Sequence, residues 1–160
     1  MDALATKILT PEEAVSFYGA LVLRTAYGMV KNQQDAEDIA QEVFLNMLKR
    51  DPFFECPEHQ KAWLIRCTLN RCKSHFRSVW QSRTDGLEDT LAIPFDPEEN
   101  VVMDAVRNLP LKYRQVIYLH YIQGYATAEI ASILNIKQNT VLSQLARGRK
   151  ILEKTLKGAF

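Results

Sequence analysis

Apolar residues recur every three or four positions along most of this chain, which is the spacing that an amphipathic helix requires. No segment alternates apolar and polar residues over the length of a β-strand, so the pattern predicts an all-α protein. The first helix is expected to begin at Pro11, because Thr10 supplies an N-cap hydroxyl and Glu13 a carboxylate three residues later. The other helices are expected to begin at Asp35 and to cover residues 60–80, 102–109, 111–123, 127–134 and 139–156.

The charged residues divide the chain into two helical halves. Residues 83–100 hold six acidic side chains, one basic side chain and two prolines, a composition that is typical of a linker. Residues 101–160 hold nine basic side chains and three acidic ones, although the whole chain has a net charge of only +1. We therefore expect a helical domain over residues 1–82, an acidic linker over 83–100 and a basic helical domain over 101–160.

The composition excludes several classes of protein. With 47% hydrophobic and 24% charged residues, the chain is neither a long disordered polymer nor a fibre. Its longest stretch without Asp, Glu, Lys or Arg, residues 115–128, is shorter than the roughly 18 to 20 residues that cross a bilayer. No secretory signal is recognisable, so we expect no direct membrane insertion and a cytoplasmic location, with Cys56, Cys67 and Cys72 as reduced thiols.

The last two expected helices have the spacing of a helix-turn-helix. A three-residue turn joins them, and Asn135 suits the left-handed backbone that this turn needs. They are expected to pack together through Ile130, Ala131, Leu134, Ile136, Val141 and Leu145. The polar residues then left outside, at the end of the second helix that enters the major groove in such motifs, are Gln138, Asn139, Thr140, Ser143 and Arg147.

These outward residues suit duplex DNA. Amide and guanidinium groups pair with base edges, and Arg149 and Lys150 farther along the helix suit phosphates. The alternative interpretation is a helical hairpin whose basic surface is merely solvated. The excess of basic residues in the second domain favours DNA.

The helix expected over residues 60–80 carries a second basic surface. Helical spacing places Arg66, Asn70, Lys73 and Arg77 on one side, about a quarter turn from its apolar stripe. A basic helix face is usually only a solvated surface. Here Trp63, together with Phe53 and Phe54 in the preceding loop, adds aromatic rings of the kind that stack on unpaired bases, which favours single-stranded nucleic acid.

The helix that begins at Asp35 is acidic. Asp38 and Glu42, with Gln41 between them, form a surface that repels DNA. On these residues alone, we interpret the acidic surface as one that keeps the protein soluble.

Two Cys/His pairs, at positions 56 and 59 and at 72 and 75, raise the alternative of a zinc site. We disfavour zinc because Cys72 lies on the expected apolar stripe. No catalytic residues, metal or cofactor are therefore expected, and no phosphate-binding loop, nucleophile elbow or carboxylate pair indicates an enzyme.

The order of these parts resembles the extracytoplasmic-function (ECF) group of bacterial RNA polymerase sigma factors. Residues 35–45 (DAEDIAQEVFL) resemble the family's region 2.2, and residues 62–66 (AWLIR), continuing through Asn70 to Arg77, resemble regions 2.3 and 2.4. Leu109-Pro110, Tyr113-Arg114-Gln115-Val116, Glu129-Ile130-Ala131 and Thr140-Val141 resemble region 4. The resemblance covers nearly the whole chain and implies a protein that directs promoter-specific transcription initiation.

The resemblance also implies a role for each surface. It implies that the protein binds core RNA polymerase through the β′ and β subunits. The residues that would contact the β′ coiled coil are Asp38, Gln41, Glu42 and Leu45. By the same resemblance, one group of residues would open the minus-10 element and hold an extruded base. This group is the loop at residues 53–59 with Trp63, Arg66, Asn70, Lys73 and Arg77. The residues that would recognise the minus-35 element are Gln138, Asn139, Thr140, Ser143, Arg147, Arg149 and Lys150.

Two further consequences and two alternatives complete the prediction. Family habit predicts an anti-sigma factor as an additional partner, and Ala126 stands where the family often has a capping serine. The first alternative is a stand-alone helix-turn-helix regulator that binds DNA without polymerase. The second is a protein-interaction module stabilised by zinc.

Overall fold

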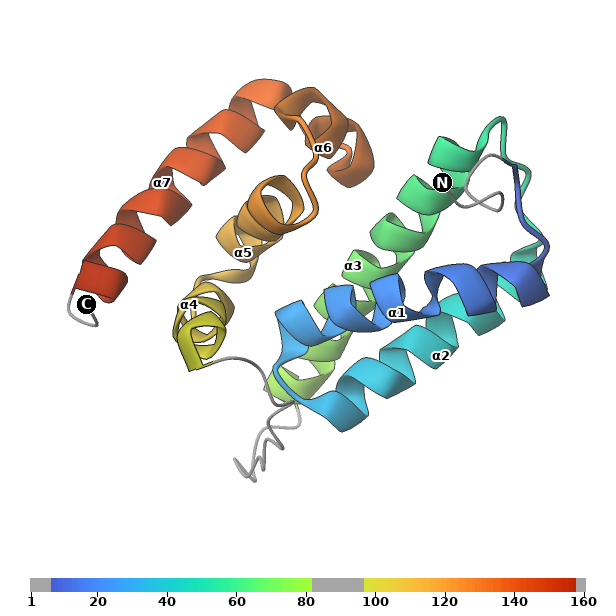
Figure 1. The fold of residues 1–160 in the computed structure, drawn as a ribbon, viewed down its shortest axis with the longest axis horizontal. Coiled ribbons are helices and arrows are strands. Elements are labelled where there is room, and N and C mark those ends of the chain that lie inside the picture. The colour runs from blue at the N-terminus through green and yellow to red at the C-terminus, as the bar shows by residue number, and fades with distance from the viewer. Residues whose placement is uncertain (1–6, 82–96, 158–160) are drawn as a thin grey trace. The chain divides into compact units, whose positions relative to one another are not determined.

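The computed structural model describes residues 7–81 and 97–157, with side chains described for 7–78 and 101–157. Every element in these ranges is helical, and the helices form two compact units (Figure 1). The first unit contains α1 (Pro11–Val30), α2 (Gln33–Arg50) and α3 (Pro57–Gln81). The second contains α4 (Pro97–Arg107), α5 (Leu111–Ile117), the π-helix η2 (Tyr118–Ile122), α6 (Thr127–Leu134) and α7 (Gln138–Lys157). The predicted all-α fold is confirmed.

Side-chain caps fix the beginning of α1, as the sequence predicts. The Glu13 N–H donates to Thr10 Oγ1 over 3.2 Å, and the Thr10 N–H donates back to Glu13 Oε1 over 2.9 Å. These bonds satisfy N–H groups that have no partner inside the helix. The hydrogen bond from Thr10 and the pairing with Lys7 lower the pKa of Glu13. The cap therefore contributes stability above the ordinary pKa of a glutamate and loses it as the pH falls.

The three helices of the first unit surround one apolar core. The helix α1 packs on both α2 and α3, and α2 also packs on α3. The core residues of α2 are Ala36, Ile39, Val43 and Met47, and those of α3 include Leu64, Ile65, Leu69 and Cys72. Cys72 is thus buried, as its place on the apolar stripe predicts.

A buried glutamine ties the segment before α1 to α3. Gln60 has no exposed surface, its Oε1 accepts the Leu9 N–H, and its Nε2 donates to the Leu9 carbonyl, each over 2.8 Å. Both polar groups of the buried Leu9 backbone are therefore satisfied by one side chain.

Replacing Gln60 with leucine is expected to lower the free energy of unfolding of the first unit by about 2–4 kcal/mol, because two backbone groups would lose their partners. Urea unfolding followed by tryptophan fluorescence measures this change, since Trp63 and Trp80 both precede residue 82. Gln34→Leu is the matched control: Gln34 is exposed and donates only to Asp38, so we expect a loss of about 0.5 kcal/mol or less. Equal losses for the two variants would contradict the proposed role of Gln60.

The second unit ends in the predicted helix-turn-helix. Helix α6 matches residues 127–134, and Asn135 has φ 58° and ψ 48°, the left-handed backbone expected of the turn. Ile130, Val141 and Leu145 are buried as expected. Ala131, Leu134 and Ile136 are only partly covered, whereas Ile133, which the sequence analysis did not assign to the packing, is buried.

Several helix boundaries differ from the expected ones: α2 begins at Gln33 instead of Asp35, and α3 begins at Pro57, so residues 57–59 of the expected loop are helical. The single helix expected over 111–123 is instead α5 followed by the π-helix η2, whose turn holds one more residue than an α-helical turn. Gly124, with a positive φ of 81°, follows this segment. Helix α4 begins at Pro97, so the last four residues of the expected acidic linker lie in its first turn. The rest of that linker, residues 83–96, lies outside the described residues.

Candidate functional site

An exposed apolar groove runs between α1 and α2. It encloses about 520 Å³. Leu45 and Leu48 line it and remain 52% and 53% exposed, although aliphatic side chains of this size are normally covered. We call this surface the α1–α2 groove; its lining residues are Val15, Gly19, Leu23, Glu37, Ala40, Gln41, Phe44, Leu45 and Leu48.

The groove contains apolar residues of α2 that continue the spacing of its packed face. Ala40, Phe44 and Leu48 follow this spacing, yet they line the groove, and Leu48 remains half exposed. The three residues from α1 were not predicted at all. The available signal was the width of the apolar stripe of α2, which exceeds what its contacts with α1 and α3 cover.

An acidic ridge borders the α1–α2 groove. It consists of Asp38 and Glu42, one turn apart on α2 and both exposed. Asp38 accepts a hydrogen bond from Gln34 over 3.3 Å, and Glu42 lies 3.6 Å from Arg71 of α3. The four residues predicted for polymerase binding thus divide between two adjoining surfaces, Gln41 and Leu45 in the groove and Asp38 and Glu42 on the ridge.

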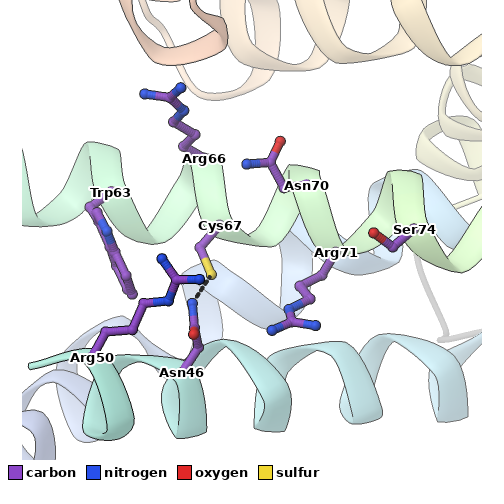
Figure 2. Close-up of a pocket in the computed structure, with 8 residues that line it drawn as sticks. All are labelled: Asn46, Arg50, Trp63, Arg66, Cys67, Asn70, Arg71 and Ser74. Atoms are coloured by element: carbon purple, nitrogen blue, oxygen red, sulfur yellow. Dashed lines mark hydrogen bonds between the residues drawn. The ribbon is translucent and has the colours of Figure 1, made fainter. Parts of the chain in front are cut away.

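A polar pocket of about 390 Å³ lies between α2 and α3 (Figure 2). Asn46 and Arg50 of α2 extend toward α3, and Cys67 and Arg71 of α3 extend toward α2. Asn46 Nδ2 donates to Cys67 Sγ over 3.3 Å, which links the two helices across the pocket. We call this the α2–α3 pocket; its lining residues are Asn46, Arg50, Trp63, Arg66, Cys67, Asn70, Arg71 and Ser74.

The α2–α3 pocket is rich in hydrogen-bond donors. Among the described residues, three arginines and no carboxylate line it, so it favours groups that accept hydrogen bonds or carry negative charge. Of these arginines, Arg71 lies 3.6 Å from an acid of the described chain, Glu42. The pocket also includes the Trp63 ring, which offers an aromatic face beside the cations. Phosphates and the acceptor edges of bases fit this chemistry.

The structure brings together three of the five residues predicted for the minus-10 element. Trp63, Arg66 and Asn70 line the pocket, with Arg66 and Asn70 on the side of α3 that faces away from α2 (Figure 2). Lys73 and Arg77 are exposed on α3 but do not line the pocket. The packing of α2 against α3 decides which residues line the pocket, so its other members were not predicted, namely Asn46 and Arg50 of α2 and Cys67, Arg71 and Ser74 of α3.

The loop before α3 presents its two phenylalanines in different ways. Phe54 is buried and makes edge-on contacts with Trp63, at 5.8 Å between ring centroids, and with His59 at 5.5 Å. Phe53 is 84% exposed. The buried ring therefore supports the pocket residue Trp63, and the exposed one stands free for a partner.

The residues predicted to contact the minus-35 element are exposed on α7. All seven reach solvent, namely Gln138, Asn139, Thr140, Ser143, Arg147, Arg149 and Lys150. Two of them are held by side chains that the sequence analysis did not single out. Gln138 donates to Thr127 Oγ1 over 2.9 Å, and Arg149 donates to the Tyr121 hydroxyl over 2.9 Å.

The cysteines and histidines do not come together as a metal site in the part of the chain that the structure describes. His59 Nδ1 accepts the Glu55 N–H over 3.2 Å, and His75 lies 3.2 Å from Asp35. Nor does any helix within the described residues have the length and apolar character needed to span a bilayer.

Comparison with known proteins gives a family for each unit. The model of sigma-70 region 2 matches residues 15–82, and that of sigma-70 region 4 matches residues 99–152. The ECF RNA polymerase sigma factor SigW of Bacillus subtilis is 31% identical over 164 residues, which cover 91% of this chain and 88% of SigW. The ECF RNA polymerase sigma factor SigE of Mycolicibacterium smegmatis is 32% identical, over 94% of this chain and 64% of SigE.

Solved structures share the fold. The sigma factor RpoE of Bartonella quintana, in complex with the anti-sigma factor NepR, matches with a TM-score of 0.78 at 22% identity, over 91% of this chain and 96% of that one. CnrH, in complex with the cytosolic domain of CnrY, matches with a TM-score of 0.69 at 23% identity, over 92% and 88%. Together, the two regions in order and the full-length similarity to SigW place this chain in the ECF group of RNA polymerase sigma factors, a family of transcription-initiation proteins and not of enzymes.

Proposed function

We propose that this sigma factor binds core RNA polymerase through the α1–α2 groove and the acidic ridge. A groove lined by aliphatic side chains between two helices accepts the apolar face of a third helix. The carboxylates of Asp38 and Glu42 then select a partner with basic residues beside that face. By resemblance to the family, this partner is the coiled coil of the β′ subunit, with the β subunit as a second contact.

The α2–α3 pocket receives an extruded base of the minus-10 element. Trp63 supplies a face for stacking inside the pocket, and Arg66 and Asn70, on the side of α3 that faces away from α2, supply donors for an adjoining base edge or phosphate (Figure 2). Lys73 and Arg77 extend the basic surface along α3 toward neighbouring phosphates. Capture of the base offsets the few kcal/mol that unstacking costs, so the promoter opens without a covalent step.

One observation carries this proposal: the groove and the pocket occupy opposite sides of α2. The groove uses residues such as Gln41 and Leu45, and the pocket uses Asn46 and Arg50, which point about half a helical turn away. The first unit is therefore able to hold polymerase and an unpaired strand at the same time.

The second unit reads the minus-35 element as duplex. Gln138, Asn139, Thr140, Ser143 and Arg147 reach base edges in the major groove, and Arg149 and Lys150 contact phosphates. The expected domains are residues 1–82 and 101–160 with the acidic linker 83–100 between them, and α4 adds residues 97–100 to the second domain. The chain acts in the cytoplasm and catalyses no reaction itself, because the polymerase joins the nucleotides. An anti-sigma factor restrains it, as NepR accompanies RpoE in the solved complex.

Transcription by purified bacterial core polymerase on a pool of promoters, with and without this protein, tests the proposal. Gln41→Ala is expected to weaken association with the core about tenfold, since it removes a polar contact at the edge of the groove. Arg147→Ala is expected to relax selectivity at the upstream element by about tenfold without reducing core association. Arg24→Ala and Lys112→Ala, exposed residues outside both surfaces, serve as controls.

Unchanged initiation when the wild-type protein is added would refute the proposal. A stand-alone regulator would instead protect a palindromic duplex without polymerase, and Gln41→Ala would leave that protection intact. A zinc-stabilised interaction module would hold near-stoichiometric metal and show no promoter preference.

A further inference from the structure

A hydrogen bond joins the first residues of the two helices of the helix-turn-helix. Gln138, at the start of α7, donates through Nε2 to Oγ1 of Thr127, at the start of α6, over 2.9 Å. The bond lies at the surface, next to the side chains proposed to enter the major groove. The left-handed turn at Asn135 and the buried pair Ile130 and Val141 hold these helix ends in register.

The Thr127 hydroxyl is not used to cap its own helix. The N-cap residue of α6 is Ala126, which has no side-chain acceptor, and its N–H is instead bound by Glu129 Oε1 over 2.9 Å. The cap is therefore provided by Glu129. This leaves the hydroxyl of Thr127 to act on the neighbouring helix.

An amide held on one side presents a defined edge on the other. A glutamine amide has two N–H donors and one carbonyl acceptor, and Thr127 engages one of the donors. The N–H on the same side as Oε1 forms with it the donor and acceptor pair that binds N7 and the N6 amino group of adenine, so this assignment gives the opposite N–H to Thr127. A freely rotating amide would present this pair in many orientations and discriminate less between bases.

We propose that Thr127 is a positioning residue that fixes Gln138 as a reader of adenine in the upstream promoter element. The inference rests on the proposed function, because it requires the start of α7 to meet base edges of duplex DNA. Thr127 itself touches no base in this assignment. It contributes to specificity through the orientation of Gln138.

The test uses holoenzyme assembled from core polymerase and the full chain, with promoters randomised across the upstream element. Thr127→Val removes the hydroxyl and keeps the shape, Thr127→Ser keeps the hydroxyl, and Ser132→Ala removes an exposed hydroxyl elsewhere on α6. We expect the wild type to prefer adenine at one position and Gln138→Ala to remove that preference. Thr127→Val is expected to reduce the same preference about tenfold at that position alone.

Further comparisons separate positioning from other roles. Thr127→Ser and Ser132→Ala are expected to keep the wild-type preference, and Thr127→Val combined with Gln138→Ala is expected to add nothing to Gln138→Ala alone. A loss that is uniform across sequences, with a weaker salt dependence, would make Thr127 a phosphate contact and overturn the inference. An unchanged adenine preference in Thr127→Val, or a Gln138-dependent preference for another base, would also overturn it. A wild-type holoenzyme with no upstream preference would instead refute the proposed function.

Discussion

Replacing Gly19 with leucine is expected to abolish binding to core RNA polymerase while leaving the fold intact. Gly19 lines the α1–α2 groove, and a Cβ built there meets nothing within 4 Å beyond its chain neighbours and the adjacent backbone of α1. A leucine therefore projects into the groove and occupies the volume that a docked helix needs. Removing a glycine from a helix interior also stabilises the free protein by roughly 0.5–1 kcal/mol. The loss of binding is thus separated from any loss of folding.

The affinity for core polymerase, measured by titration of labelled protein, is expected to fall at least about 100-fold, which corresponds to roughly 3 kcal/mol of overpacking at the interface. Ala20→Leu is the matched control, because Ala20 is exposed on the next position of α1 and does not line the groove. Gly19→Ala is expected to have a smaller effect in the same direction. Wild-type affinity in Gly19→Leu would exclude the groove as the docking surface.

Local signals in the sequence account for most of the secondary structure. Thr10 and Glu13 predicted the beginning of α1, and Asn135 predicted the turn between α6 and α7. Each is an interaction between residues a few positions apart, so the sequence is sufficient to identify it. The π-helix η2 was not predicted, because periodicity does not distinguish one added residue from a continuous helix over so short a segment.

The candidate surfaces were only partly predictable, for a different reason. The family resemblance assigned Gln41 and Leu45 to one surface, and helical spacing placed Arg66 and Asn70 on another, because these two residues are four positions apart on one helix. The residues that complete each surface come from a second helix. Their juxtaposition depends on how α2 packs against α1 and α3, and an apolar stripe indicates that a face is covered without indicating by what.

Replacing Trp63 with alanine is expected to reduce opening of a duplex promoter by about 10- to 100-fold. Stacking of a base on an aromatic side chain contributes roughly 1–3 kcal/mol, and Trp63 is the aromatic residue that lines the α2–α3 pocket. Permanganate reactivity of unpaired thymines measures the opening. Trp63→Phe is expected to keep most of the activity, since it retains an aromatic face.

A template with the minus-10 element already unpaired distinguishes base capture from a general defect. On that template the cost of unstacking is met in advance, so the defect of Trp63→Ala is expected to shrink by about tenfold. Because Trp63 also packs edge-on against the buried Phe54, the melting temperature of each variant must be measured alongside. An equal defect on duplex and unpaired templates, in a variant that remains folded, would mean that Trp63 supports polymerase binding or local structure instead of holding a base.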